Sequence, residues 1–182
     1  MEQYDVVVVG GGIAGSALAA KLASADVQVL LLERQTTYRD KVRGEFMHVW
    51  GAAEMIGLGL EDVLAGAGGG YSTKMVGYNE GEDPALAEAT AIPLSMLLPG
   101  VPGAMCVGHP QASEALNTHA ERCGADVRRG VGDVEVTAGG APVVRYELDG
   151  VIHEAPCRLI VGADGRQSTV RRALHIGLEQ CE

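Results

Sequence analysis

Residues 4–33 read YDVVVVGGGIAGSALAAKLASADVQVLLLE, and this stretch decides the fold. It opens with a continuous apolar run at 4–9, which is typical of a strand buried on both faces of a parallel sheet. The alanine- and leucine-rich segment at 13–25 predicts a helix whose small residues allow close packing. A second apolar run at 27–32 predicts another strand. Strand, helix and strand within about 30 residues form a βαβ unit, so we expect an α/β domain built on a parallel sheet.

The turn between the first strand and the helix carries the pattern G-x-G-x-x-G. Gly10 is expected to make the tight turn, Gly12 to let the backbone approach a pyrophosphate, and Gly15 to let helix and strand pack closely. The free backbone amides at the helix start, around Ile13 and Ala14, favour a negatively charged phosphate. Because the pattern follows a strand and opens a helix, it predicts a Rossmann-like dinucleotide site.

Glu33 ends the second strand, 23 residues after Gly10. Its carboxylate is placed to accept hydrogen bonds from an adenosine ribose and to repel a 2′-phosphate. We therefore predict an FAD- or NAD-type adenosine site and disfavour NADP there. Arg34, the next residue, is included among the cofactor-binding candidates. The alternative is an ordinary turn followed by a solvated glutamate.

Composition narrows the class of protein. The 182 residues include 14 basic and 24 acidic side chains, and the net charge of −10 disfavours nucleic acids and anionic membranes as partners. The uncharged stretch 91–108 contains three prolines that would break a membrane-spanning helix, so we expect a strand and a loop there. The N-terminus lacks the features of a signal peptide. We expect a cytoplasmic protein without stable membrane insertion.

The four cysteines are widely spaced and form no Cys-x-x-Cys pair. This spacing predicts neither a zinc site nor a thioredoxin-like redox motif, and we assign no metal ligands. Reduced structural thiols are the simplest interpretation for a cytosolic protein.

The rest of the chain alternates helices and strands. Three strands, the last two joined by an Asp-Gly turn, predict a β-meander crossover that leads back to the sheet. The predicted elements are a helix at 49–56, a helix at 111–122, a strand at 125–128, the meander strands at 131–136, 143–148 and 151–154, a strand at 158–161 and a helix at 168–174.

A second motif, RLIVGADGRQSTVR, occupies residues 158–171. It passes from an apolar strand through Asp164-Gly165 into a basic helix start, with Ser168 as a candidate N-cap. The residues alone leave two interpretations open, a ligand-facing loop and an ordinary strand-to-helix turn.

Together the two motifs resemble those of the group A FAD-dependent monooxygenases, the flavoprotein hydroxylases typified by p-hydroxybenzoate hydroxylase. Asp164, Gly165, Ser168 and Arg171 match the family's D-G-x-x-S-x-x-R fingerprint. The resemblance implies that these four residues help to hold the FAD pyrophosphate region and take part in NAD(P)H use. The strand-rich segment 131–154 also resembles the family's β-meander.

Two weaker matches lie in the middle of the chain. Arg43 resembles a family arginine that lies near the flavin's phosphates, where a guanidinium can contact phosphate bidentately. Relatives carry an arginine or glutamine seven residues before the position of Leu116. This chain has His109 there instead, and Gln111 is the nearby substitute, so both are candidates for cofactor contact.

The resemblance implies an oxidoreductase in which NAD(P)H reduces FAD and a flavin C4a-hydroperoxide passes one oxygen atom to an organic substrate, aromatic or polyketide-like. No residue is assigned as a catalytic acid or base. The family's later Gly-Asp motif has no match, so we expect residues 1–182 to form an FAD-binding domain that is incomplete C-terminally. Within it, residues about 70–108 are expected to begin a substrate-side subdomain.

Three other functions stay open. A flavin-dependent halogenase or a prenyl-chain reductase would have the same fold, although the halogenase Trp-x-Trp-x-Ile-Pro signature is absent and Trp50 is the only tryptophan. A non-catalytic FAD- or NAD-binding fragment is the alternative from another class.

Overall fold

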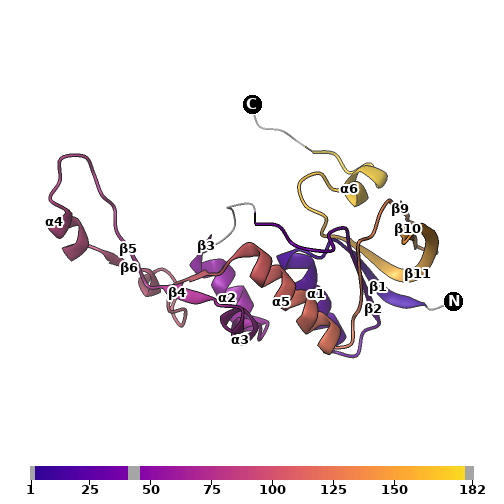
Figure 1. Cartoon of the computed structure of the whole chain (residues 1–182), viewed down its shortest axis with the longest axis horizontal. Helices are drawn as coiled ribbons and strands as arrows, with labels where there is room; N and C mark the ends of the chain where they lie inside the picture. The colour runs from indigo at the N-terminus through magenta and orange to yellow at the C-terminus, as the bar shows by residue number, and fades with distance from the viewer. Residues whose placement is uncertain (1–2, 41–45, 179–182) are drawn as a thin grey trace. The chain divides into compact units, whose positions relative to one another are not determined.

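The computed structural model describes residues 3–40 and 46–178 (Figure 1). The chain divides into two compact units, one formed by Met1–Tyr38 with Ser113–Glu182 and the other by Arg39–Ala112. Residues 70–108 lie within the second unit, and their role as the start of a substrate-side subdomain stays a prediction.

The first unit is built on a six-stranded sheet in the order β8-β2-β1-β11-β10-β9. Strands β8, β2, β1 and the second half of β11 run parallel, whereas the first half of β11 pairs antiparallel with β10, which pairs antiparallel with β9. The α/β prediction, with its parallel sheet and three-stranded meander, is therefore confirmed. The strands are β1 (Tyr4–Val9), β2 (Val29–Glu33), β8 (Asp126–Arg129), β9 (Val134–Thr137), β10 (Val143–Leu148) and β11 (Val151–Gly162).

The largest difference from the predicted elements lies in the last strand. The sequence predicts separate strands at 151–154 and 158–161, whereas the structure has a single strand of 12 residues, β11. Residues up to Pro156 pair with β10, and residues from Cys157 onward pair with β1. Pro156 lies where the strand changes partners, so the strand continues through it and joins the meander to the parallel sheet.

Both faces of the central strands are buried, as the apolar runs predict. On one face, Val7 and Val9 of β1 form a core with Leu30 and Leu32 of β2 and with Val144 of the meander. Helix α1 (Ile13–Ala23) packs on β1 and β2 and buries its small residues. The unit also contains α6 (Thr169–Ala173) and most of α5 (His109–Arg122).

The second unit contains short elements around a three-stranded antiparallel sheet in the order β3-β7-β4. The predicted helix at 49–56 and the strand and loop predicted for 91–108 are both confirmed. The elements are β3 (Phe46–Met47), α2 (Val49–Gly57), α3 (Glu61–Gly66), β4 (Gly70–Ser72), β5 (Lys74–Met75), α4 (Pro84–Ala89), β6 (Ile92–Pro93), a 3-10 turn (Leu94–Met96) and β7 (Ala104–Cys106).

Candidate functional site

The glycine-rich turn connects β1 to α1 at the carboxyl edge of the parallel strands. Gly10 has a φ of +109°, a left-handed conformation that favours glycine. A Cβ atom on Gly10 would lie 2.6 Å from the carbonyl carbon of Ala163, and one on Gly15 would collide with the Gly10 carbonyl oxygen. Side chains at these two positions would therefore push the turn apart.

Gly12 differs from these neighbours because a Cβ atom there would meet nothing within 4 Å. Gly12 is also the N-cap residue of α1, where no side chain caps the helix and the first turn contains no acidic residue. Helices leave their first N–H groups without intrahelical partners, and here these belong to the turn that includes Ile13 and Ala14. The open space and the free amides suit a phosphate group.

Glu33 lies beside this turn at the end of β2 and is 6% exposed. Its carboxylate accepts hydrogen bonds from the backbone N–H of Gly11 at 2.6 Å and of Gln35 at 2.7 Å. A carboxylate offers about four lone-pair sites, so capacity for ribose hydroxyls remains, and the ribose contact stays a prediction. Arg34 is exposed to solvent.

The second motif packs against the first. The strands β1 and β11 are parallel neighbours in register, with Val9 opposite Gly162, and the N–H of Ala163 donates to the Val9 carbonyl at 2.7 Å. The Ala163–Asp164 peptide is consequently the surface on which Gly10 rests. Ligands of open α/β sheets bind outside the carboxyl ends of such strands, and both motifs lie at that edge.

Asp164 and Ser168 hold the turn into α6. One carboxylate oxygen of Asp164 accepts hydrogen bonds from the N–H groups of Thr169 at 2.6 Å and Val170 at 3.2 Å. The Ser168 hydroxyl accepts from the N–H of Arg171 at 3.0 Å, which confirms Ser168 as the N-cap. The other Asp164 carboxylate oxygen is buried without a hydrogen-bond partner in the described part of the chain.

The remaining candidates are less closely tied to the turn. Gly165 has a φ of +81°, so the Asp-Gly turn requires glycine there. The Arg171 guanidinium donates to the carbonyl of Ile176 at 3.3 Å, just past its own helix. His109 and Gln111 lie in the first turn of α5 and belong to the second unit. Arg43 lies outside the described residues.

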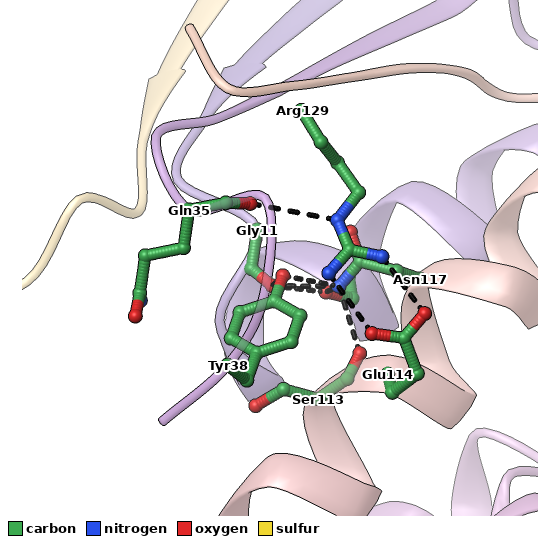
Figure 2. A network of polar contacts seen from close by, with 8 residues as sticks. Gly11, Gln35, Tyr38, Ser113, Glu114, Asn117 and Arg129 are labelled. Atoms are coloured by element: carbon green, nitrogen blue, oxygen red, sulfur yellow. Dashed lines mark hydrogen bonds and ion pairs between the residues drawn. The ribbon is translucent and has the colours of Figure 1, made fainter.

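A buried polar network that the sequence analysis missed holds the glycine turn from inside (Figure 2). The carbonyl of Gly11 accepts hydrogen bonds from Ser16 at 2.8 Å, Tyr38 at 2.6 Å and Asn117 at 2.8 Å. Gly11 itself has no room for a side chain, since a Cβ atom would lie 2.7 Å from the Cβ of Glu33. The motif allows any residue at position 11, but in this chain the space beside Glu33 fits only glycine there.

The ring of Tyr38 packs against an ion pair between Arg129 and Glu114. Arg129 forms a bidentate ion pair with Glu114, at 2.8 and 2.9 Å, and its guanidinium lies 5.0 Å from the Tyr38 ring centroid. Burial raises the pKa of Tyr38 above its ordinary value, and the nearby Glu33 charge raises it further. The Tyr38 hydroxyl donates to the Gly11 carbonyl, and the raised pKa keeps this donor protonated well into the alkaline range.

A helical pattern could have indicated part of this network. Ser113 and Asn117 are four residues apart on α5, within the buried stripe of Ala112, Leu116 and Ala120. Polar side chains on an otherwise apolar helix face require hydrogen-bond partners, although the pattern does not identify those partners.

The described residues form neither a metal centre nor a membrane-spanning helix. Within 3–40 and 46–178, no three His, Cys, Asp or Glu side chains cluster closely enough to hold a metal ion. The same ranges contain no helix with the length and apolar character needed to cross a membrane. Cys106, Cys123 and Cys157 are free thiols, and Cys181 lies outside the described residues.

Comparison with known proteins gives a family match along the chain. The family model described as "FAD binding domain" matches residues 3–182. A rifampicin monooxygenase from Streptomyces venezuelae is 29% identical over 179 residues, which cover 95% of this chain and 34% of that protein.

Several solved structures show the same fold with more than 25% identity, and two of them are OxyS and CndH. The anhydrotetracycline hydroxylase OxyS from Streptomyces rimosus is 26% identical with a TM-score of 0.79, and the match covers 100% of this chain and 36% of OxyS. The myxobacterial chondrochloren halogenase CndH is 29% identical with a TM-score of 0.77, covering 95% of this chain and 40% of CndH. The chain thus spans 34% to 40% of the length of these three relatives.

Proposed function

The chain belongs to the FAD binding domain family matched over residues 3–182, and we propose that its glycine turn holds the FAD of a monooxygenase. In this proposal NAD(P)H supplies electrons, dioxygen is the oxidant, and one oxygen atom passes to a small organic substrate, aromatic or polyketide-like. The observation that carries the proposal is the packing of Gly10 against Ala163 and Asp164. This packing brings both motifs to one sheet edge, beside the open position at Gly12.

Each residue group has a limited task in this proposal. The free amides that begin α1, next to Gly12, receive the FAD diphosphate. Glu33 accepts from the ribose with the lone pairs that its two backbone hydrogen bonds leave over. Asp164 keeps the supporting turn in place. Bound FAD supplies the redox chemistry, while the protein binds and orients it.

The names of the relatives support oxygenation. The rifampicin monooxygenase and the anhydrotetracycline hydroxylase each match at least 95% of this chain. Both names specify transfer of oxygen to an organic molecule. We extend the reaction class to this chain, and we leave the particular substrates with those proteins.

The first experiment is an FAD titration of the purified chain, followed by absorbance spectroscopy and an assay of NAD(P)H oxidation. Bound oxidised flavin and flavin-dependent NAD(P)H consumption are expected. Gly12→Leu should weaken FAD binding by about 100-fold or more, because the side chain fills the phosphate approach. Gly140→Leu is the matched control, since Gly140 is also open and has no positive φ. A colourless chain that takes up no FAD would contradict the proposal.

A flavin-dependent halogenase is the second candidate, favoured by the likeness to CndH. The two activities separate by product. With NAD(P)H, dioxygen, an organic substrate and chloride, mass spectrometry distinguishes addition of oxygen from addition of chlorine. A chain that binds FAD but leaves NAD(P)H unoxidised would instead support a non-catalytic FAD-binding role.

A further inference from the structure

The peptide between Gly11 and Gly12 is held by side chains from three separate segments of the chain. Its carbonyl accepts from Ser16 on α1, from Tyr38 after β2 and from Asn117 on α5. The last of these donors is 106 residues away in sequence. Ser16 is 0% exposed and Asn117 is 1% exposed, so the carbonyl points into the protein, away from solvent.

The direction of this carbonyl sets the direction of the next amide. In a planar trans peptide the C=O and N–H bonds point to opposite sides, and the described chain contains no cis peptide. The Gly12 N–H therefore points away from the buried donors. Gly12 borders open space, because a Cβ atom there would meet nothing within 4 Å. Because the Gly11 carbonyl points inward, the Gly12 N–H points toward the open space beside Gly12.

Asn117 is the residue that joins these contacts. Its side-chain nitrogen lies 2.8 Å from the Gly11 carbonyl and also 2.8 Å from the Ser16 hydroxyl, the Tyr38 hydroxyl and the Ser113 carbonyl. An amide nitrogen has two N–H donors, so these four acceptors share them. Loss of the amide would remove one of the three donors to the Gly11 carbonyl and leave only Ser16 and Tyr38, so the Gly11–Gly12 peptide would be held less firmly.

Tyr38 adds a second, shorter contact to the same carbonyl. Its hydroxyl lies 2.6 Å from the Gly11 oxygen. Arg129, paired with Glu114, packs on its ring (Figure 2). The ring position therefore does not depend on the hydroxyl, and removing the hydroxyl alone should leave the packing intact.

We propose that Asn117 and Tyr38 are positioning residues that hold the Gly11 carbonyl inward and so aim the Gly12 N–H at the diphosphate of the bound dinucleotide. The inference rests on the proposed function and deepens it. Asn117 and Tyr38 act through the Gly11 peptide and need not touch the cofactor. Their effect should fall on recognition of the diphosphate and should leave recognition of adenosine unchanged.

The test compares ADP with adenosine, which differ only in the diphosphate, and uses FAD as the complete cofactor. Dissociation constants are measured for FAD by titration, and for ADP and adenosine by displacement of FAD. Asn117→Leu should weaken FAD and ADP by about tenfold or more, while adenosine changes by less than about twofold. Tyr38→Phe should show the same selectivity with a loss of about threefold, and it serves if Asn117→Leu does not fold. Ser113→Ala is the matched control, because Ser113 is buried one turn earlier and its hydroxyl has no partner among the described residues.

The outcomes separate the inference from the function on which it rests. Equal losses for ADP and adenosine would show a general structural role and would overturn the inference, as would unchanged ADP affinity in both variants. A wild-type chain that binds neither FAD nor ADP would overturn the proposed function and this inference together. Wild-type binding of both ligands, with an unchanged ADP-to-adenosine ratio in the variants, would overturn the inference alone.

Discussion

Helices α1 and α6 begin in opposite ways, although each follows a parallel strand and a glycine-containing turn. The N-cap of α1 is Gly12, and no side chain accepts from its first amides. At α6, Asp164 accepts from two backbone N–H groups and Ser168 from a third. The amides are free at the start of the first helix and are occupied by the chain itself at the second.

This difference separates the tasks of the two motifs. A helix start with free N–H groups can receive an external anion, whereas one already capped cannot do so without losing its own hydrogen bonds. Under the proposed function, the first motif is the one that receives the cofactor's diphosphate. The second motif shapes the peptide at Ala163 on which Gly10 rests.

The largest effect on stability is expected from Gly15→Ala. The new methyl group would collide with the Gly10 carbonyl and lie 3.1 Å from the Cβ of Ala163, which should cost about 3 kcal/mol of unfolding free energy. Gly57→Ala is the matched control, because a Cβ there meets nothing within 4 Å, and it should raise stability by up to about 1 kcal/mol. Urea unfolding measures both, and a Gly15→Ala chain as stable as wild type would contradict the close packing of the motifs.

Gly12→Asp converts the open helix start into a capped one. The backbone of Gly12 is extended, with a φ of −70° and a ψ of −175°, a conformation that suits an aspartate N-cap. The apo chain should gain a few tenths of a kcal/mol, whereas FAD affinity should fall by about 100-fold because the carboxylate occupies and repels the diphosphate position. Thermal unfolding and FAD titration should therefore change in opposite directions. Retained FAD affinity would place the diphosphate elsewhere.

The fold was predictable where its elements are local and strongly patterned. The βαβ unit at 4–33 and the meander strands follow from short apolar runs with clear turns between them. The largest misjudged boundary is the division of β11 near Pro156, a residue type that is unusual inside a strand. Here the strand changes partners at that residue, and strand partners cannot be read from a local pattern.

The motif residues of the site were predictable from the sequence, and the contacts around Gly11 were not. The two motifs identify Gly10, Gly12 and Asp164 as candidates for cofactor binding, and the structure brings the two turns that carry them together. The network around Gly11 was missed because its donors come from segments up to 106 residues away. Asn117 and Tyr38 have no motif of their own, so only folding reveals which carbonyl they contact.

Asp164→Ala tests the capped helix start, that of α6. Removing the carboxylate leaves the N–H groups of Thr169 and Val170 without their acceptor, which should cost about 1 to 2 kcal/mol of stability. FAD affinity should also fall, by about three- to tenfold, because the peptide beneath Gly10 loosens. Urea unfolding and FAD titration give the two values. A loss of FAD binding far larger than this, without loss of stability, would instead indicate direct contact between Asp164 and the cofactor.

Ser168→Ala should have the smallest effect on stability and FAD affinity, and it distinguishes a helix-capping role of Ser168 from contact with the cofactor. It removes one N-cap acceptor, at 3.0 Å from the Arg171 N–H, and should cost about 1 kcal/mol of stability with at most about a twofold loss of FAD affinity. The matched control is Asp83→Ala, which removes the side-chain N-cap of α4 in the second unit, where Asp83 accepts from the Ala85 N–H at 3.0 Å. Both variants lose a helix cap, but only Ser168 belongs to the turn behind Gly10.

If both leave FAD affinity unchanged, the second motif acts on the nucleotide turn through Asp164 alone. A loss of FAD affinity well above twofold in Ser168→Ala would show instead that the Ser168 hydroxyl serves the cofactor, and the division of tasks between the two helix starts would fail.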